Sequence, residues 1–381
     1  MSFDCIVVGA GLAGITAART VQRAGNSVLL LEASDQVGGR VRSDVVEGFI
    51  CDRGFQVINP RYPQVEKSKV IKDLDFKYIS GKIRLKDEGL KVGYSPSTLS
   101  PKLGSISQKL KFLKFVASSR VENERSFGHY TTDFPDLYQK VLKPFLSGVF
   151  LTDPNEIAAD VAQEILRSFV RSLPGVPAAG VGEFSQALAK PIQNIKFNES
   201  VQTVSNGQVI TNHGTYKSRY IIVATDPTTA AQLLTGLHLP KMLTSTTAYF
   251  ATDQPPIDSN NLVISNNSRL VNSIVISQVS RKYAPAGKHL VSATSLSPMT
   301  ESVFRKELAD IWQINTHSWE YVARYEIKQS LPAHLPGVSK TRAAKFSDSI
   351  FIAGDHLALP SQQGAMQSGY LAANAINQLI Q

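Results

Sequence analysis

Three glycines and one carboxylate near the start of the chain have the spacing that most directly indicates chemistry. Gly9, Gly11 and Gly14 form a Gly-x-Gly-x-x-Gly pattern. In such a turn the first glycine allows a sharp bend, the second lets the backbone approach a pyrophosphate, and the third lets the next helix pack closely. Glu32, eighteen residues after Gly14, is placed to accept hydrogen bonds from a ribose diol and to repel a 2′-phosphate. The pattern therefore predicts a site for an adenine dinucleotide and disfavours NADP.

The elements around these residues must form a strand, a helix and a second strand. Residues 3–8 contain a short apolar run that is typical of a parallel strand buried on both faces. We expect a helix over 12–24, ended by Gly25 in a left-handed conformation, and a strand over 27–31. The helix N-terminus would then hold the pyrophosphate on its unpaired amides. The alternative is a purely structural turn without a ligand, and the strand and helix on either side argue against it.

Composition bounds the class of protein. The chain has 381 residues, of which 43% are hydrophobic and 19% charged, so it can fold into two domains with their own cores. The net charge of +9 suits anionic ligands or an anionic surface, or it belongs to a solvated exterior. Two cysteines exclude a disulfide framework and argue against a metal site. No nucleic-acid recognition module is present, and we expect no signal peptide, no membrane span and a cytoplasmic location.

A lysine-rich region over 64–126 differs from the first stretch. It predicts short strands at 76–78, 83–85 and 90–92, followed by an amphipathic helix. The helix carries one apolar stripe flanked by Lys109, Lys111 and Lys114, and the stripe consists of Ile106, Leu110, Leu113 and Ala117. We favour a helix that packs this stripe onto its own domain, because most amphipathic helices do so. The alternative is a basic helix that makes peripheral contact with a membrane surface.

The remaining elements indicate a discontinuous fold. We expect helices over 138–150 and 157–173, and an irregular loop through Asp52, Gly54 and Gln56. Strands are expected at 195–197, 201–204, 208–211, 214–216, 220–224 and 349–353, a mixture of strands and helices over 244–330, and a last helix over 363–376.

The predicted fold class is α/β. A Rossmann-type domain would be built from 1–63, 184–235 and 335–381, and an inserted α+β substrate-binding domain from 64–183 and 236–334. A ligand that spans both domains is long, which favours a flavin dinucleotide over a nicotinamide one.

Taken together, these motifs resemble those of the flavin-containing amine oxidoreductases, in the branch with phytoene desaturases and protoporphyrinogen oxidases. The resemblance covers nearly the whole chain. It implies a GR2-like FAD-binding domain. The motifs that carry it are the three-glycine turn, Glu32, Gly38-Gly39-Arg40-x-Arg42, Asp52-x-Gly54-Phe55-Gln56, residues 221–226 and Ile352-Ala353-Gly354-Asp355, with 144–150 and 177–182 favouring the desaturase side.

The resemblance also implies roles for individual residues around a bound FAD. Glu32 would bind the adenosine ribose, Val201 the adenine, Arg40 the pyrophosphate, and Asp355 a ribityl hydroxyl or the phosphate region. The loop at 54–56 would lie along the isoalloxazine, and the start of the last helix at its pyrimidine end. The predicted cofactor-binding residues are Gly9, Ala10, Gly11, Leu12, Ala13, Gly14, Glu32, Ala33, Gly38, Gly39, Arg40, Gly54, Phe55, Gln56, Val201, Ala224, Gly354, Asp355, Gly364, Ala365 and Met366.

The chain departs from the amine oxidases of this family at two places. Where those enzymes carry an aromatic residue near the last helix, it has Pro360-Ser361-Gln362. Their flavin-bridging lysine corresponds to residues 245–247 here, although Lys241 lies nearby. No cysteine lies near the C-terminus, so we expect non-covalent FAD.

These features predict an FAD-dependent oxidoreductase that moves a hydride from a C–H bond to flavin N5. The expected substrate is a small lipophilic molecule, isoprenoid-like or tetrapyrrole-like. The sequence identifies no catalytic acid or base, since His356 fits a packed or solvated histidine as well as one near the flavin. It also leaves open the electron acceptor and the oligomeric state. Three alternatives stay open: amine oxidation with an aromatic cage that uses Tyr249 or Trp319, a non-redox flavoenzyme such as a sugar mutase, and a binding protein of the kind that includes the GDP-dissociation inhibitors.

Overall fold

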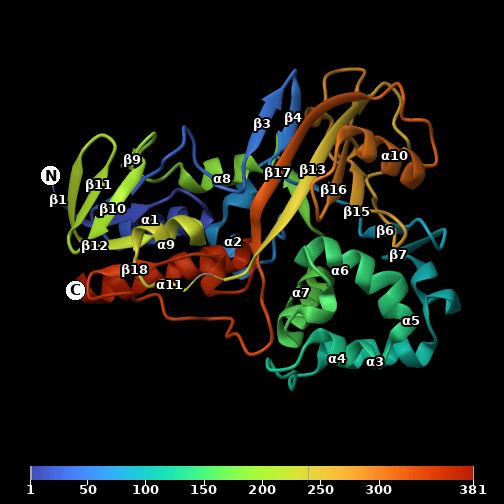
Figure 1. Cartoon of the computed structure of the whole chain (residues 1–381), viewed down its shortest axis with the longest axis horizontal. Coiled ribbons are helices and arrows are strands. Elements are labelled where there is room, and N and C mark those ends of the chain that lie inside the picture. Colours follow the sequence, from blue (N-terminus) through green and yellow to red (C-terminus); the bar gives the residue numbers. More distant parts are fainter. Residues whose placement is uncertain (1, 239, 381) are drawn as a thin grey trace.

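A mostly parallel sheet, antiparallel where β11 pairs with β10 and β12, forms the part of the molecule that the first motif predicted. The computed structural model describes residues 2–238 and 240–380. The sheet has the strand order β10-β11-β12-β1-β2-β9, and β18 also pairs with β12 (Figure 1). Its strands are β1 (Ser2–Val8), β2 (Val28–Leu31), β9 (Ile195–Lys196), β10 (Val201–Ser205), β11 (Gln208–Thr211), β12 (Thr215–Val223) and β18 (Ile350–Ile352). The neighbours of β1 and β2, and the pair of β12 and β18, are parallel. Strands from the start, middle and end of the chain thus share one sheet.

Helices cover both faces of this sheet, and their close packing explains the small residues in them. The helices α1 (Leu12–Arg23) and α11 (Gln362–Ile380) lie together on one face, and the short α9 (Pro227–Leu233) lies on the other. A Cβ at Gly369 would lie 2.0 Å from the carbonyl oxygen of Ala13, so this contact between α11 and α1 requires glycine. Cys5 to Val8 are at most 3% exposed, as expected for a strand covered on both faces.

A second sheet forms the other half of the molecule. Its order is β17-β13-β16-β15-β14-β6-β7, antiparallel except where β14 meets β6. The helix α10 (Glu301–Trp312) covers one face with an apolar cluster, and the other face turns toward the first half (Figure 1). The strands are β6 (Lys82–Leu85), β7 (Leu90–Gly93), β13 (Met242–Thr252), β14 (Leu262–Ile264), β15 (Leu270–Val275), β16 (His289–Ser295) and β17 (Glu320–Pro332).

A helical region lies beside the second sheet and has its own core of aromatic residues. It contains α3 (Ile106–Ala117), α4 (Phe127–Thr131), α5 (Pro135–Leu137), a π-helical turn (Tyr138–Leu142), α6 (Lys143–Phe150) and α7 (Ala159–Arg171). The remaining elements are α2 (Pro63–Ser68), α8 (Gly182–Ala189), β3 (Ser43–Val46), β4 (Phe49–Asp52), β5 (Phe76–Tyr78), β8 (Gly175–Pro177) and short 3-10 turns. No helix among the described residues is long and apolar enough to cross a membrane.

Three expectations about local structure were wrong. The strands expected at 214–216 and 220–224 are one strand, β12, because its first half pairs with β11 and its second half with β18. Asp52 is not in a loop but ends β4, which pairs with β3.

The third error concerns α3, whose apolar stripe does not pack inward. Ile106, Leu110 and Leu113 are 73%, 60% and 59% exposed. The inward face is formed by Phe112, Phe115 and Val116, which meet the aromatic core of α4 and α5. The larger, aromatic stripe packs into the core, and the aliphatic stripe faces outward.

Candidate functional site

The glycine-rich turn has the geometry of a phosphate cradle. Gly9 has φ +96°, a conformation that favours glycine, and its N–H donates to the carbonyl of Leu31 at 2.7 Å. A Cβ at Gly14 would lie 1.9 Å from the Gly9 oxygen, whereas a Cβ at Gly11 would meet no atom within 4 Å. The space beside Gly11 is therefore open, and no side chain caps the N-terminus of α1. Amides of the first helical turn can face a pyrophosphate there, so these residues fit a dinucleotide.

Glu32, directly after β2, is held in a fixed position beside this turn. One carboxylate oxygen accepts from the Ala10 N–H at 2.7 Å, and the other accepts from the N–H and hydroxyl of Ser34 at 2.9 and 2.6 Å. Val201, the predicted adenine contact, begins β10 two residues after Glu199, whose N–H donates to the Glu32 carbonyl. Carboxylate oxygens accept more than one hydrogen bond each, so Glu32 can still receive a ribose diol.

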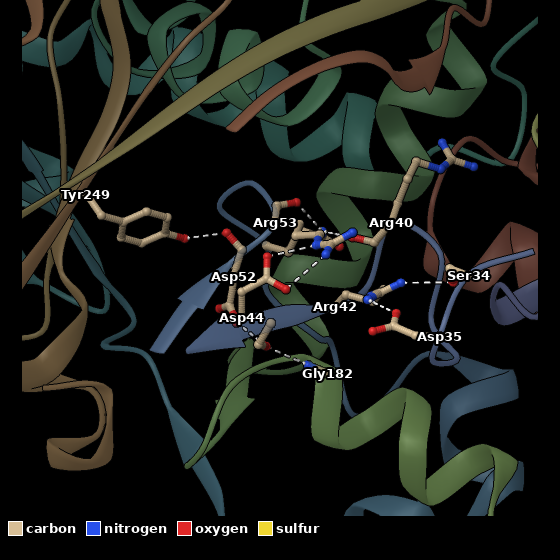
Figure 2. A network of polar contacts seen from close by, with 11 residues as sticks. Ser34, Asp35, Arg40, Arg42, Asp44, Asp52, Arg53, Gly182 and Tyr249 are labelled. Carbon is tan, nitrogen blue, oxygen red and sulfur yellow. Dashed lines mark hydrogen bonds and ion pairs between the residues drawn. The ribbon is translucent and has the colours of Figure 1, made fainter. Parts of the chain in front are cut away.

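Ser34 and Arg42 support Glu32 and were not among the predicted site residues. Arg42 is buried and donates to the Ser34 hydroxyl and to Asp35, both at 3.0 Å (Figure 2). In the sequence, the only feature that marked this contact was the second arginine of the Gly-Gly-Arg-x-Arg run, which is Arg42.

Arg40 and Asp355 lie together, although 315 positions separate them in the sequence. The guanidinium donates to the Asp355 carboxylate at 2.8 Å and to the Ser330 carbonyl at 2.8 Å. Burial alone would lower the pKa of Arg40, but the Asp355 carboxylate outweighs it and the pKa is raised. The backbone that leads to Arg40 runs beside the glycine turn, since Gly38 forms a β-bridge with Gly11 and its N–H donates to the Ala10 carbonyl at 2.8 Å.

The predicted isoalloxazine loop is tied to both halves of the molecule. Gly54 has φ +84°, and the Phe55 N–H donates to the Thr247 hydroxyl at 3.2 Å. Gln56 donates to the Arg40 carbonyl at 2.6 Å and accepts from Gln362 at 3.4 Å. The loop, Arg40 and the start of α11 thus meet at Gln56.

Asp52 is a buried carboxylate directly before this loop, with donors from three segments. Ser43, Val181 and Tyr283 donate to its side chain at 2.6, 3.0 and 2.8 Å. The hydroxyl of Tyr249, on β13, donates to its carbonyl at 2.9 Å (Figure 2). Burial raises the pKa of Asp52 to about 6, against the effect of these hydrogen bonds. Asp52 therefore links β4 to β3, to Val181, to the 3-10 turn Arg281–Tyr283 and to β13 of the second sheet. We call this set of contacts the Asp52 clasp, and it holds the start of the loop in place.

The start of α11 is close-packed, and its amides are partly used. A Cβ at Gly364 would lie 1.7 Å from the Leu359 oxygen. The Gly364 N–H donates to the Ser361 hydroxyl and the Ala365 N–H to the Ser361 carbonyl. The Met366 side chain is buried in the core. The side-chain oxygen Oε1 of Gln362 is buried and has no hydrogen-bond partner. Unlike the Gly364 and Ala365 amides, it can therefore still accept a hydrogen bond beside the loop.

Other residues that the sequence singled out, Ala224, Gly354 and His356, make contacts within the protein. The Ala224 N–H donates to the Val8 carbonyl, and its side chain borders the close contact at Gly14. His356 packs over Gly354, and burial lowers its pKa to about 4, so it is neutral near pH 7. A neutral histidine at this place cannot supply a fixed positive charge.

The face of the second sheet that lies beside the loop carries hydroxyl groups. Thr247 pairs with the Thr294 hydroxyl at 2.9 Å, and Ser245 pairs with the Ser330 hydroxyl at 2.6 Å. These positions include the expected place of the family lysine, and Lys241 is exposed to solvent. The hydroxyls satisfy one another, so this wall requires no polar ligand.

A cavity of about 340 Å³ lies between α6 and the adjacent ends of β15 and β16. None of the predicted cofactor residues lines it. Its walls include Lys143 and Ser147 from α6, Leu270 from β15, and Leu296 directly after β16. This cavity belongs to the junction of the helical region and the second sheet, not to the dinucleotide cradle.

Comparison with known proteins relates the chain to flavoproteins. Residues 12–377 match the family model described as flavin containing amine oxidoreductase. Putrescine oxidase of Kocuria rosea is 53% identical over 57 residues, which is 15% of this chain and 12% of that protein. L-amino acid dehydrogenase of Synechocystis is 45% identical over 60 residues, 16% of this chain and 13% of that protein. The matched segments are thus a small part of these curated relatives.

Solved structures match over nearly the whole chain but at low identity. An oxidoreductase from Methanosarcina mazei has a TM-score of 0.80 at 16% identity, covering 97% of this chain and 99% of that one. A protein described as a protoporphyrinogen oxidase from Exiguobacterium has a TM-score of 0.75 at 18% identity, covering 100% of both chains. Putrescine oxidase with bound putrescine has a TM-score of 0.73 at 15% identity, covering 99% of both chains. The fold is therefore the α/β fold of these oxidoreductases, as predicted.

Proposed function

This chain belongs to the flavin-containing amine oxidoreductase family, with FAD as its cofactor, and we propose that it oxidises a small lipophilic substrate at a C–H bond. The observation that carries the proposal is the meeting of Arg40, Asp355, Gln56 and Gln362, from both ends of the chain, beside the open glycine turn. When bound, FAD accepts the hydride at N5 and so supplies the redox chemistry.

The chain's own residues would bind and orient the cofactor. The α1 amides and Arg40 would hold the pyrophosphate, and Glu32 the ribose, with Ser34 and Arg42 fixing its carboxylate. Gly54 to Gln56 would lie along the flavin, held by the Asp52 clasp and by Thr247. We assign no side chain as acid or base, because His356 is neutral and buried.

Two observations favour a lipophilic substrate over an amine. Tyr249 donates to Asp52, and Trp319 packs with Phe250 in the cluster under α10, so neither aromatic is free to form an amine cage. The hydroxyl wall of Ser245 and Thr247 is internally paired, which suits a substrate with few hydrogen-bonding groups. We therefore favour a desaturase or dehydrogenase, in which the Gly54–Gln56 loop and this wall would face the substrate.

The test begins with the visible spectrum of the purified protein before and after acid precipitation. We expect a flavin band that is released into the supernatant, which indicates non-covalent FAD. A Glu32→Ala variant should retain less flavin, roughly tenfold or more weaker in affinity, because hydrogen bonds to a charged group are lost. A colourless protein that cannot be reconstituted with FAD would favour a binding protein instead.

Anaerobic titration then separates the remaining alternatives. Polyenes and reduced tetrapyrroles, presented in detergent, should bleach the flavin, whereas putrescine should not. Bleaching by putrescine alone would establish amine oxidation. Isomerisation of a nucleotide sugar without net flavin reduction would establish a mutase, an activity suggested by the structural likeness to UDP-galactopyranose mutase, with a TM-score of 0.76 at 16% identity, covering 99% of this chain and 96% of that one.

A further inference from the structure

The surface of the helical region around α3 has an unusual composition. Residues 94–120 contain five basic residues and no aspartate or glutamate. Over the whole chain there are 31 acidic residues among 381, so a stretch of this length would ordinarily contain about two. The five cations are Lys102, Lys109, Lys111, Lys114 and Arg120.

The same stretch exposes large aliphatic side chains. Ile106, Leu110 and Leu113 follow one another at helical spacing on the outer face of α3 and are more than half exposed. Leu99, in the 3-10 turn Pro96–Leu99, is 72% exposed. The Lys109 ammonium donates to the carbonyls of Leu99, Ser100 and Gly104, which holds this turn against α3. We call the surface formed by Leu99, Ile106, Leu110 and Leu113 the α3 surface.

The fold itself does not need the α3 surface. The helix is already fixed by the inward residues Phe112, Phe115 and Val116. Its C-terminal end is held from α7, where Gln163 donates to the Phe115 and Ser118 carbonyls and Arg167 to those of Val116 and Ser118. Isolated exposed apolar residues are common, but four gathered on one well-anchored surface mark an interaction site.

From these observations we propose that the α3 surface docks the protein onto an anionic lipid bilayer. Apolar side chains enter the boundary between headgroups and acyl chains, while flanking lysines face the anionic headgroups. Lys111 pairs with Asp133, and both side chains remain about half exposed, so this pair can exchange for a headgroup. The stretch 94–120 contributes no carboxylate of its own, and the two aspartates that lie beside α3, Asp133 and Asp136, are paired with Lys111 and Gln108.

The proposal does not depend on the redox function. If the substrate is lipophilic, however, docking on a bilayer would bring the protein to the place where such a substrate dissolves. The helix α3 lies near the lower edge of Figure 1, and β3 lies near the upper edge. The helical region that carries the α3 surface also borders the cavity between α6 and β15.

Vesicle co-sedimentation of the full chain tests this directly. Vesicles of phosphatidylcholine with about 30% phosphatidylserine should bind the protein, and phosphatidylcholine alone should bind it several-fold more weakly. A triple variant, Ile106→Ser, Leu110→Ser and Leu113→Ser, should lose at least roughly tenfold in partitioning. Replacing Lys102 and Lys114 by glutamine should cost about fivefold for each lysine at low salt and reduce the salt dependence.

Matched controls separate docking from general damage. Val45, on β3, is 76% exposed and Leu379, on α11, is 50% exposed, so Val45→Ser and Leu379→Ser should bind vesicles as the parent does. Flavin content should be equal in all these proteins. The proposal is overturned if the parent ignores anionic vesicles or if the triple variant binds them as well as the parent. It is also overturned if sedimentation shows a dimer that only the triple variant loses, because the surface then serves a second copy of the chain.

Discussion

The first sheet and the helical region differ in how far they bury their regular apolar runs. In β1 the apolar run is buried almost completely, whereas on α3 an equally regular stripe lies in solvent. A parallel strand has sheet neighbours and a helix layer on both faces, so its apolar residues have nowhere else to lie. A helix meets its neighbours on one side only, and α3 carries two apolar stripes. Periodicity therefore predicts the helix but does not decide which stripe turns inward.

The first prediction tests the close packing of the dinucleotide half, where both the stability of the fold and the bound flavin should be lost. Gly14→Ala would bring a Cβ to 1.9 Å from the Gly9 oxygen, so the turn and α1 must separate. We expect a loss of about 3 kcal/mol or more in unfolding free energy, measured by urea denaturation, together with loss of bound flavin. Gly11→Ala is the matched control, because φ is −72° and the space is open. It should leave the flavin-free protein as stable as the parent while weakening FAD binding. Equal destabilisation by both changes would show that the turn is structural only.

The second prediction compares the two stripes of α3. Phe115→Ala removes a ring that contacts Phe127, Tyr130 and Phe134, and it should cost about 3–5 kcal/mol. Leu110→Ser removes a side chain that is 60% exposed, and it should change stability by less than about 0.5 kcal/mol. Denaturation without lipid measures both. A large cost for Leu110→Ser would mean that the outer stripe is covered in solution.

The same contrast explains which features of the protein could be predicted from the sequence. The glycine turn, Glu32, the strands at 76–78 and 83–85 and the buried Cys5 depend on local rules, and the structure agrees with them. The FAD-dependent oxidoreductase was also predicted correctly at the level of the family. The division into two domains and the roles of the cofactor residues stay predictions.

Other features depend on contacts between distant parts of the chain, which a single sequence does not encode visibly. Tyr283 and Tyr249 reach Asp52 from 231 and 197 positions away, and nothing local marks either tyrosine. The merging of two predicted strands into β12 likewise depends on β18, which comes from the end of the chain. Contacts at such junctions between the halves follow no local sequence rule, and only the three-dimensional structure reveals them.

Asp52 provides the third prediction, at the junction of the two halves. Its pKa is about 6 in the folded protein, above the ordinary 3.8, because burial disfavours the charge. The folded state therefore holds its proton more tightly than the unfolded chain, and this contribution to stability is present below about pH 4 and is lost as the pH rises through 6. The difference between the ordinary pKa of 3.8 and the folded-state pKa of about 6 corresponds to at most about 3 kcal/mol of stability.

Asp52→Asn isolates this effect, since asparagine does not titrate. The unfolding free energy of the parent minus that of the variant should be largest near pH 4 and should shrink toward pH 7. Other titrating groups, including His356, are common to both proteins and cancel in the difference. A difference that grows with pH would mean that Ser43, Tyr283 and the Val181 amide stabilise the charged carboxylate more than burial opposes it. The Asp52 clasp would then stabilise the folded protein through the charged carboxylate, and its contribution would be lost as the pH falls.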